Sequence, residues 1–263
     1  MRATLGEMRR TVISSAFERR IALGSSGPIV SFTFDDFPRS ALAIGGELLK
    51  SFGTRGTYYA AIGLMNSVTE LGEQFRREDV ESLLHDGHEL GHHTFGHISA
   101  RSMPARSFRE EVKKGRAAIE ELTGYWTPSN FAYPFGQITL GAKRLVGAEV
   151  TSARGIWPGF NGPLVDLNLL RANSLYGDRA SCPKVQEIIL ENERRRSWTI
   201  FYSHDVHLTP SRYGCTPDLL EFAVSFALQR KARVLTIADV ITELVSQPHE
   251  IEHSAVSLQD GSR

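Results

Sequence analysis

Short apolar runs alternate with longer amphipathic stretches along most of the chain, from Ile29 to about Val245. Residues 29–34 form an apolar run typical of a buried strand, and residues 40–51 follow with the spacing of a helix. Residues 198–203 predict a later buried strand, and another helix is expected to begin near Pro217. This alternation is the pattern of a parallel sheet whose strands are joined by crossover helices.

The remaining expected elements continue this order. Further strands are expected at 56–62, 88–93, 129–135, near Val150, near Leu170 and at 233–237, and further helices at 78–87, 107–122, 140–146 and 185–195. Ser107 and Glu110 form a capping-box pattern at one helix start, and Gly124 is expected to end that helix. About seven or eight strand–helix units predict an α/β fold, a distorted (β/α) barrel of about seven strands. An open doubly wound sheet is the alternative, with fewer and longer units.

The length of 263 residues suits one barrel domain. We expect an N-terminal extension at 1–28, a catalytic domain at 29–247 and a polar tail at 248–263. Cys182 and Cys215 lie outside any metal-type spacing and are expected to be structural thiols.

The balanced charge argues against nucleic acid and anionic membranes as partners. Thirty basic residues match thirty acidic ones, so no overall field attracts nucleic acid or an anionic membrane. No stretch approaches the ~20 apolar residues of a membrane span, and the Arg-rich N-terminus lacks the apolar stretch of a secretion signal. A cytoplasmic protein is therefore expected. The pattern makes no prediction of oligomeric state.

Histidines cluster in the run HDGHELGHHTFGH, which holds five of the nine in the chain, from His85 to His97. Neutral imidazole is the commonest side-chain metal ligand, so a divalent ion is the first hypothesis. Two pairs have four-residue spacing, His88 with His92 and His93 with His97, and spacing alone does not separate them.

Polar residues also follow three of the expected strands, where a parallel barrel carries its catalytic groups. These residues are Asp35, Asp36, His92, His93, His204 and Asp205. One Asp and two His supply the three ligands of a catalytic zinc, which leaves a position for water. The pKa of such a water can fall from about 15.7 to about 7, so the pattern favours a hydrolytic site.

Four segments, TFDDFP, HTFGH, FAYPFG and FYSHD, resemble in order the motifs of the polysaccharide deacetylase family, the NodB-homology domain of carbohydrate esterase family four. The resemblance covers about residues 30–237. It implies removal of an N-acetyl group from an amino sugar in a saccharide or polysaccharide precursor, with a divalent metal ion, expected to be zinc. Whether that saccharide is free, nucleotide-linked or lipid-linked stays open.

The first two motifs imply specific roles for the acids and histidines. Asp35 corresponds to the catalytic base and Asp36 to a metal ligand. HTFGH matches the second motif and implies His93 and His97 as the other two ligands. The remaining histidines of the run, His85, His88 and His92, are then expected to be structural or on a helix surface.

The third motif differs from the family pattern. The family has Arg-x-Pro-Tyr, whose Arg orients the catalytic Asp, and this chain has Ala132 at the Arg position. The backbone amide of Phe135 retains the implied oxyanion-binding role. The fourth motif is matched weakly, by Trp157 without its acids. We hypothesise that Arg154 reaches Asp35 from another strand, with a surface Arg as the alternative.

The fifth motif implies His204 as the general acid, with Asp205 either orienting it or turning away. Phe37 replaces a family Gly and is expected either to narrow the mouth of the site or to pack in the core. Candidate substrate-binding residues are Tyr133, Arg154 and Trp157, with Phe160 and Tyr213 as further aromatic candidates. Two alternative functions stay open: hydrolysis of a cyclic amide or ureide on the same scaffold, and non-catalytic glycan binding by a decayed site.

Overall fold

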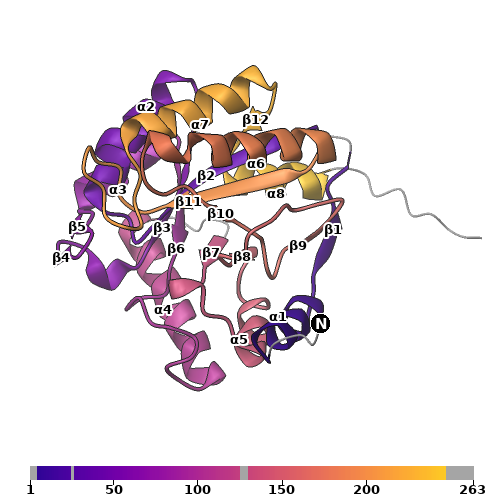
Figure 1. Cartoon of the computed structure of the whole chain (residues 1–263). Helices are drawn as coiled ribbons and strands as arrows, with labels where there is room; N and C mark the ends of the chain where they lie inside the picture. The colour runs from indigo at the N-terminus through magenta and orange to yellow at the C-terminus, as the bar shows by residue number, and fades with distance from the viewer. Residues whose placement is uncertain (1–4, 25–26, 125–129, 247–263) are drawn as a thin grey trace, which may run out of the picture.

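The computed structural model describes residues 5–24, 27–124 and 130–246, and its centre is a parallel sheet curved into a barrel (Figure 1). Seven strands follow one another in the order β10–β11–β2–β3–β6–β7–β8, and β12 pairs with β2. Their bounds are β2 (Ile29–Asp35), β3 (Thr57–Ala60), β6 (Glu89–His92), β7 (Asn130–Ala132), β8 (Ser152–Arg154), β10 (Asn173–Ser174), β11 (Trp198–Ser203) and β12 (Arg233–Val234).

Backbone hydrogen bonds continue the sheet from β8 to Leu170, which lies shortly before β10. The amide of Leu170 donates to the carbonyl of Ala153 at 2.8 Å, and the amide of Gly155 donates to the carbonyl of Leu170 at 3.0 Å. Three residues further on, β10 begins and pairs with β11. The distorted barrel of about seven strands is therefore confirmed, and the alternative of an open sheet is wrong.

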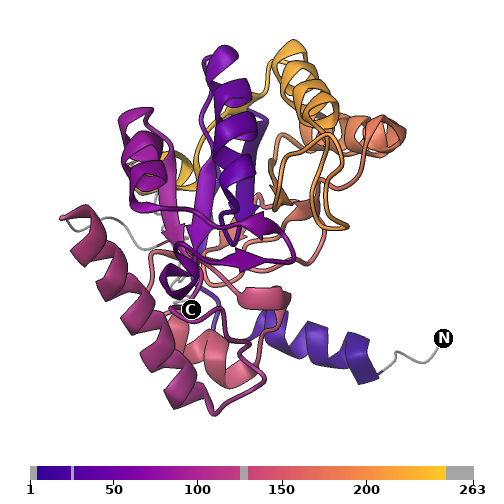
Figure 2. The ribbon, with the colours of Figure 1, turned by 90° about the vertical axis from the view of Figure 1, so that its left-hand side faces the viewer.

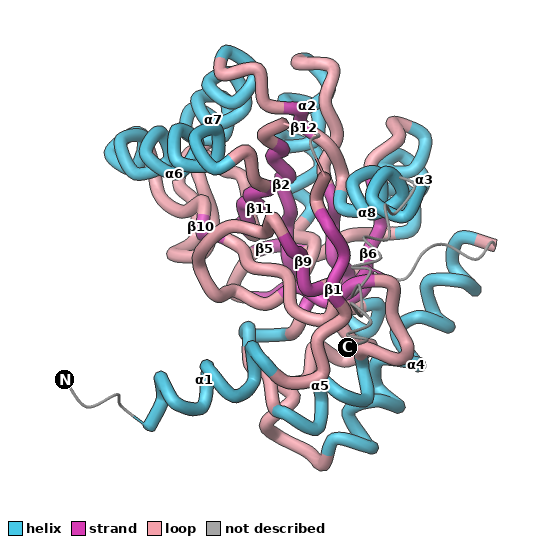
Figure 3. The backbone as a smooth tube through the Cα atoms, turned by 90° about the vertical axis from the view of Figure 1, so that its right-hand side faces the viewer, coloured by secondary structure: helices cyan, strands magenta, loops and turns pink. Residues whose placement is uncertain are grey.

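Helices cover the outside of this barrel (Figure 3). They are α2 (Glu47–Ser51), α3 (Arg77–His85), α4 (Ala105–Thr123), α5 (Leu140–Val146), α6 (Cys182–Arg195), α7 (Pro217–Gln229) and α8 (Ile237–Ser246). Every residue of β2 is buried, because its odd and even side chains meet different cores. Phe32 and Phe34 pack toward the helices, whereas Ile29 joins Trp198 inside the barrel.

Two local details differ from the sequence expectation, and a third agrees with it. The capping box at Ser107 is wrong: α4 begins two residues earlier, at Ala105, with Pro104 in the N-cap position. Proline is tolerated at a helix start because its φ is fixed and it has no backbone N–H to leave unsatisfied. Residues 41–46 form a π-helix ahead of α2. Gly124 ends α4 in the left-handed conformation, φ 77°, as predicted.

Two small antiparallel pairs, not predicted from the sequence, flank the barrel. β1 (Arg20–Ala22) pairs with β9 (Leu164–Asp166), and β4 (Val68–Thr69) pairs with β5 (Gly72–Glu73). Both cysteines are free thiols. Within the described ranges, no helix combines the length and apolar character needed to cross a bilayer. The expected tail at 248–263 lies outside the described residues.

A buried lysine ties the N-terminal helix α1 (Leu5–Ser15) to the barrel; Figure 2 shows α1 in indigo beside the lower part of the molecule. Lys143 on α5 is fully buried, and its Nζ donates to the carbonyls of Ile13 and Ser14 at 3.0 and 3.1 Å. The same Nζ lies 2.8 Å from Asp166 on β9. One charge therefore joins α1, α5 and β9.

Replacing Lys143 with Met should lower the free energy of unfolding by about 3 kcal/mol, because it leaves a buried carboxylate and two carbonyls without their donor. Urea unfolding followed by circular dichroism measures this change. Lys184→Met, on the exposed face of α6, is the matched control and should unfold like the wild type. Equal stability of the two variants would show that the Lys143 contacts do not hold α1.

Candidate active site

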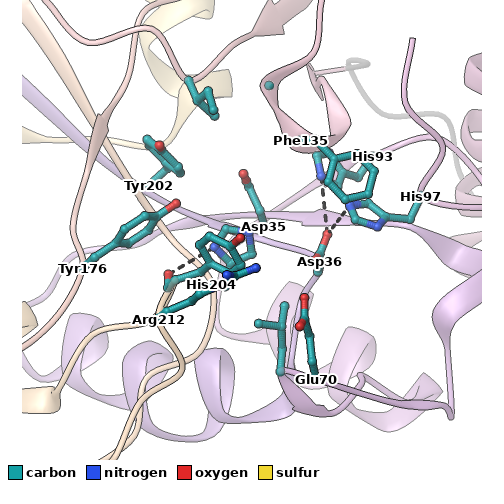
Figure 4. Close-up of a pocket in the computed structure, with 14 residues that line it drawn as sticks. Asp35, Asp36, Glu70, His93, His97, Phe135, Tyr176, Tyr202, His204 and Arg212 are labelled. Atoms are coloured by element: carbon teal, nitrogen blue, oxygen red, sulfur yellow. Dashed lines mark hydrogen bonds and ion pairs between the residues drawn. The ribbon is translucent and has the colours of Figure 1, made fainter. Parts of the chain in front are cut away.

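Asp36, His93 and His97 come together at the carboxyl ends of β2 and β6 (Figure 4). The Oδ1 atom of Asp36 lies 3.0 Å from Nε2 of His97 and 3.4 Å from Nε2 of His93. One ligand atom from each residue lies within 4.8 Å of the others, which is compatible with a single ion. Asp36 and His93 are buried, and the His97 side chain is 18% exposed.

The backbone around this cluster adopts conformations that non-glycine residues rarely take. Asp36 has φ 64°, Thr94 φ 62°, His97 φ 52° and Phe135 φ 58°. Such residues mark sites where surrounding contacts hold the chain against its local preference. The loop after β6 is held by close packing on α4, where a Cβ on Gly115 would lie 2.7 Å from the backbone of Thr94.

Hydrogen bonding of His93 tests whether these residues fit a metal ion. Nδ1 of His93 lies 2.7 Å from the carbonyl oxygen of Ala132, which can only accept, so Nδ1 carries the proton. Burial lowers the pKa of His93 to about 4, so the ring is neutral at pH 7 and Nε2 has a lone pair. That lone pair faces the Asp36 carboxylate, and a cation between these two acceptors would stabilise the arrangement. The residues fit a divalent ion, since metal-binding histidines usually donate their other ring N–H to a carbonyl or carboxylate, as His93 does to Ala132.

The Asp36 carboxylate is also held in its charged form. Burial by itself would raise its pKa, but the contacts with His97, His93 and His204 lower it to about 2. A carboxylate that stays ionised over the whole physiological range is a suitable ligand for a cation.

Asp35 turns in the opposite direction, into the barrel, where it meets Arg154. The Arg154 guanidinium on β8 donates through Nη2 to Oδ1 of Asp35 and through Nη1 to the carbonyl of Gly155 at 2.9 Å. Both side chains are almost fully buried, with 1% and 5% exposure. The alternative of a surface Arg at position 154 is therefore wrong.

Two aromatic rings enclose the buried guanidinium. The Cζ atom of Arg154 lies 4.9 Å from the ring centre of Tyr59 and 5.3 Å from that of Tyr202. Burial by itself would lower the pKa of Arg154, but the charge of Asp35 raises it, so the group stays cationic. A desolvated cation on aromatic faces gains more than an exposed one, which stabilises the pair.

Across the pocket, His204 follows β11 with its ring oriented by a backbone carbonyl. Nδ1 of His204 lies 3.2 Å from the carbonyl oxygen of Tyr213 and donates a hydrogen bond to it. Nε2 is the ring nitrogen that takes no part in this bond. Asp205 turns away: its carboxylate accepts from the amide of Ser211 at 2.7 Å and from the Ser211 hydroxyl. The second alternative for Asp205 is thus the one observed.

These groups line one pocket of about 420 Å³. Its lining residues are Asp35, Asp36, Glu70, Leu71, His93, His97, Phe135, Gly136, Ile156, Tyr176, Tyr202, His204, Arg212 and Tyr213. The Phe135 ring lies 4.5 Å from the His97 ring, centre to centre, and its side chain is among the exposed large apolar groups. The pocket therefore combines acids, histidines and aromatic walls within the size of a small ligand.

Several expected residues lie elsewhere. Tyr133 is buried against Phe108 and Phe131, so a direct substrate contact is wrong for it. Arg154 is likewise buried, does not line the pocket and contacts Asp35 instead. Trp157 lines a neighbouring cavity, described below.

Other candidate residues pack in the core, lie outside the pocket or lie at the surface. Phe37 is fully buried and stacks on Phe75 with ring centres 4.9 Å apart, so it does not line the mouth. Phe160 lies outside the pocket, under the guanidinium of Arg195. The three remaining histidines of the run are structural or exposed: His85 ends α3 at the surface, His88 accepts from an amide, and His92 is buried beside Phe131.

Among the lining residues that sequence reasoning missed, four are charged or aromatic. Tyr176 and Tyr202 sit on or beside strands, where aromatic residues ordinarily signal core, and Glu70 and Arg212 belong to loops. The one available signal was Tyr202, two residues before the implied acid His204, because alternate residues of a strand share a face.

Comparisons with known proteins agree with this fold and with the family resemblance. Residues 24–148 match the family model described as polysaccharide deacetylase, so the resemblance to that family is confirmed for this part of the chain. Over 143 residues the chain is 23% identical to the peptidoglycan-N-acetylglucosamine deacetylase PgdA of Listeria monocytogenes. That alignment covers 54% of this chain and 29% of the relative, so the chain spans less than a third of the relative it matches.

Solved structures show the same fold at low sequence identity. The Xyl-CE4 domain of a xylanase from the hindgut metagenome of Trinervitermes trinervoides has a TM-score of 0.58 at 14% identity, covering 85% of this chain and 94% of that one. Chitin deacetylase from Colletotrichum lindemuthianum has a TM-score of 0.57 at 17% identity, covering 82% and 88%. PdaA of Bacillus subtilis, a family 4 carbohydrate esterase, has a TM-score of 0.56 at 11% identity, covering 91% of each chain.

The buried His92 predicts a loss of stability in acid. Burial lowers its folded-state pKa to about 3 from 6.5, so between these values the unfolded chain binds a proton that the folded chain does not. The free energy of unfolding therefore falls as pH decreases through this window, by about 1.4 kcal/mol for each unit of pH. Urea unfolding midpoints between pH 6.5 and 4 should depend less on pH in His92→Asn than in the wild type.

His85→Asn, at the exposed end of α3, is the control, and its unfolding midpoint should depend on pH as in the wild type. If the midpoint of His92→Asn also depends on pH as in the wild type, other groups cause the acid sensitivity.

Proposed function

We propose that the chain is a metal-dependent hydrolase that removes N-acetyl groups from an amino sugar in a saccharide or polysaccharide precursor. The observation that carries the proposal is the neutral His93 whose unprotonated nitrogen faces the Asp36 carboxylate, with His97 alongside. The family match and the deacetylases among the relatives supply the bond type and the substrate class.

Asp36, His93 and His97 would hold the ion, which we expect to be zinc because two imidazoles and one carboxylate are a common catalytic zinc set. When bound there, the ion polarises the amide carbonyl and lowers the pKa of water. No further residue of the described pocket is needed to bind the ion, since a catalytic zinc leaves one coordination position for water or substrate.

Asp35 acts as the general base that takes a proton from the attacking water. Its Oδ1 accepts a hydrogen bond from Arg154, so the guanidinium fixes the orientation of the carboxylate. This positioning matters because a base must lie within hydrogen-bond reach of the proton that it removes.

Two further groups act on the substrate, one by stabilising the oxyanion and the other by supplying a proton. The backbone amide of Phe135, in a turn with φ 58°, donates to the developing oxyanion, an interaction worth about 3 to 4 kcal/mol for one donor. His204, oriented by the Tyr213 carbonyl, gives a proton to the departing amine from the opposite wall. Without that proton a strongly basic amine anion would have to leave, so the acid is essential.

Substitutions should separate metal binding from proton transfer. Asp36→Ala and His97→Ala should lose the ion and activity together, whereas Asp35→Asn and His204→Ala should keep the ion and lose at least about a hundredfold in turnover. Metal content by plasma mass spectrometry and acetate release from N-acetylated mono- and oligosaccharides measure the two properties. His85→Asn is the control. Wild-type turnover in Asp35→Asn or His204→Ala would contradict the roles proposed for them.

Treatment with a chelator should abolish acetate release from the wild type, and added zinc should restore it. The same screen should include a cyclic ureide. Acetate release distinguishes the proposal from both alternatives, because a ureide hydrolase opens the ring instead and a glycan-binding protein releases nothing.

Arg154→Met should lower kcat by about a hundredfold with metal content unchanged, because Asp35 loses the group that orients it. Arg154→Lys should recover only part of kcat, because an ammonium carries the charge without the planar fork. Wild-type kcat in Arg154→Met would refute this role.

A further inference from the structure

A second cavity lies beside the catalytic pocket. Its volume is about 450 Å³, and Phe135, Gly136 and Ile156 line both cavities. The far side is formed by α1 and by the segment that contains Trp157. The exposed Phe135 side chain therefore borders both the proposed acetamide site and this second cavity.

The lining of the second cavity is basic and contains no acidic residue. Arg9 and Arg10 on α1 and Arg101 in the loop after His97 contribute three guanidinium groups. None of the ion pairs among the described residues involves these three side chains, although the whole chain has equal numbers of basic and acidic residues. Arg10 lies over the Trp157 ring, with Cζ 6.0 Å from its centre.

The wall that α1 provides is fixed to the barrel. Ile13 of α1 is 3% exposed and also lines the cavity, and the adjoining carbonyls accept from the buried Lys143. The arginines one turn earlier are therefore held near Arg101 and Trp157. Three like charges in one concavity repel one another, and an anion between them relieves that repulsion.

We propose that this basic cavity binds an anionic group of the saccharide substrate, either a phosphate-type group or a carboxylate. The sugar would place its acetamide in the catalytic pocket and its charged substituent beyond Phe135, among Arg9, Arg10 and Arg101. Arginine favours both groups because its planar fork donates two hydrogen bonds to paired oxygens. The inference rests on the proposed deacetylase function and adds the charge class of its substrate.

A binding measurement tests the cavity without using catalysis. Inorganic pyrophosphate is titrated calorimetrically into the full chain at low ionic strength, into Arg9→Gln, Arg10→Gln and Arg101→Gln, and into the triple variant. We expect each single variant to weaken binding about tenfold or less, the triple variant to abolish it, and added salt to weaken the wild type. Arg106→Gln, an exposed residue of α4 outside the cavity, is the matched control. Binding equal in the wild type and the triple variant would overturn the proposal.

A kinetic measurement then distinguishes the two anions. Acetate release is compared for neutral N-acetylglucosamine oligosaccharides, N-acetylglucosamine 1-phosphate and N-acetylmuramic acid. In the triple variant KM should rise at least about tenfold for the preferred anionic sugar, with kcat and the neutral substrate unchanged. The sugar whose KM rises identifies the anion as phosphate-type or carboxylate.

Two failures can be told apart. If no sugar releases acetate while pyrophosphate binding depends on the arginines, the deacetylase function is wrong and the anion site stands. If acetate is released with equal KM by the wild type and the triple variant on every sugar, the anion site is wrong and the deacetylase function stands.

Discussion

The buried pair of Asp35 and Arg154 is the interaction on which the arrangement of the site depends. Moving either charge alone into the barrel would cost several kcal/mol, so each is tolerated there only with the other and with the rings of Tyr59 and Tyr202 around the guanidinium. The pair draws Asp35 inward, while the positive φ of the next residue turns Asp36 toward the histidines. Two adjacent acids with like charge thereby serve separate partners, and neither competes for the other's ligand.

The barrel and the ends of its strands could be predicted because they depend on a periodic pattern. Strand β2 and the position of Asp35 and Asp36 at its end follow from the apolar run before them. His93 and His97 were chosen by resemblance to a motif, since spacing equally allowed His88 and His92. The geometry now gives a physical reason for that choice, as His88 accepts from the amide of Gly56 and is thus engaged elsewhere.

Other features depended on contacts between distant segments and were not readable from local pattern. The carbonyl of Tyr213 orients His204, but a carbonyl belongs to every residue and leaves no mark in a sequence. Phe37 and Tyr133 lie within recognised motifs, yet both side chains face the core because the backbone turns beside them. The link from Lys143 to α1 joins residues about 130 positions apart, beyond any periodic signal.

Ala132 and Arg154 are direct neighbours in the sheet, paired in register between β7 and β8. The motif that the Ala132 segment resembles has an arginine at this position, and in this chain the guanidinium that contacts Asp35 comes from the neighbouring strand. An arginine at both positions would bury an excess charge, and an arginine at neither would leave Asp35 unpaired. The residue at one of these positions therefore restricts which residues the other position can hold.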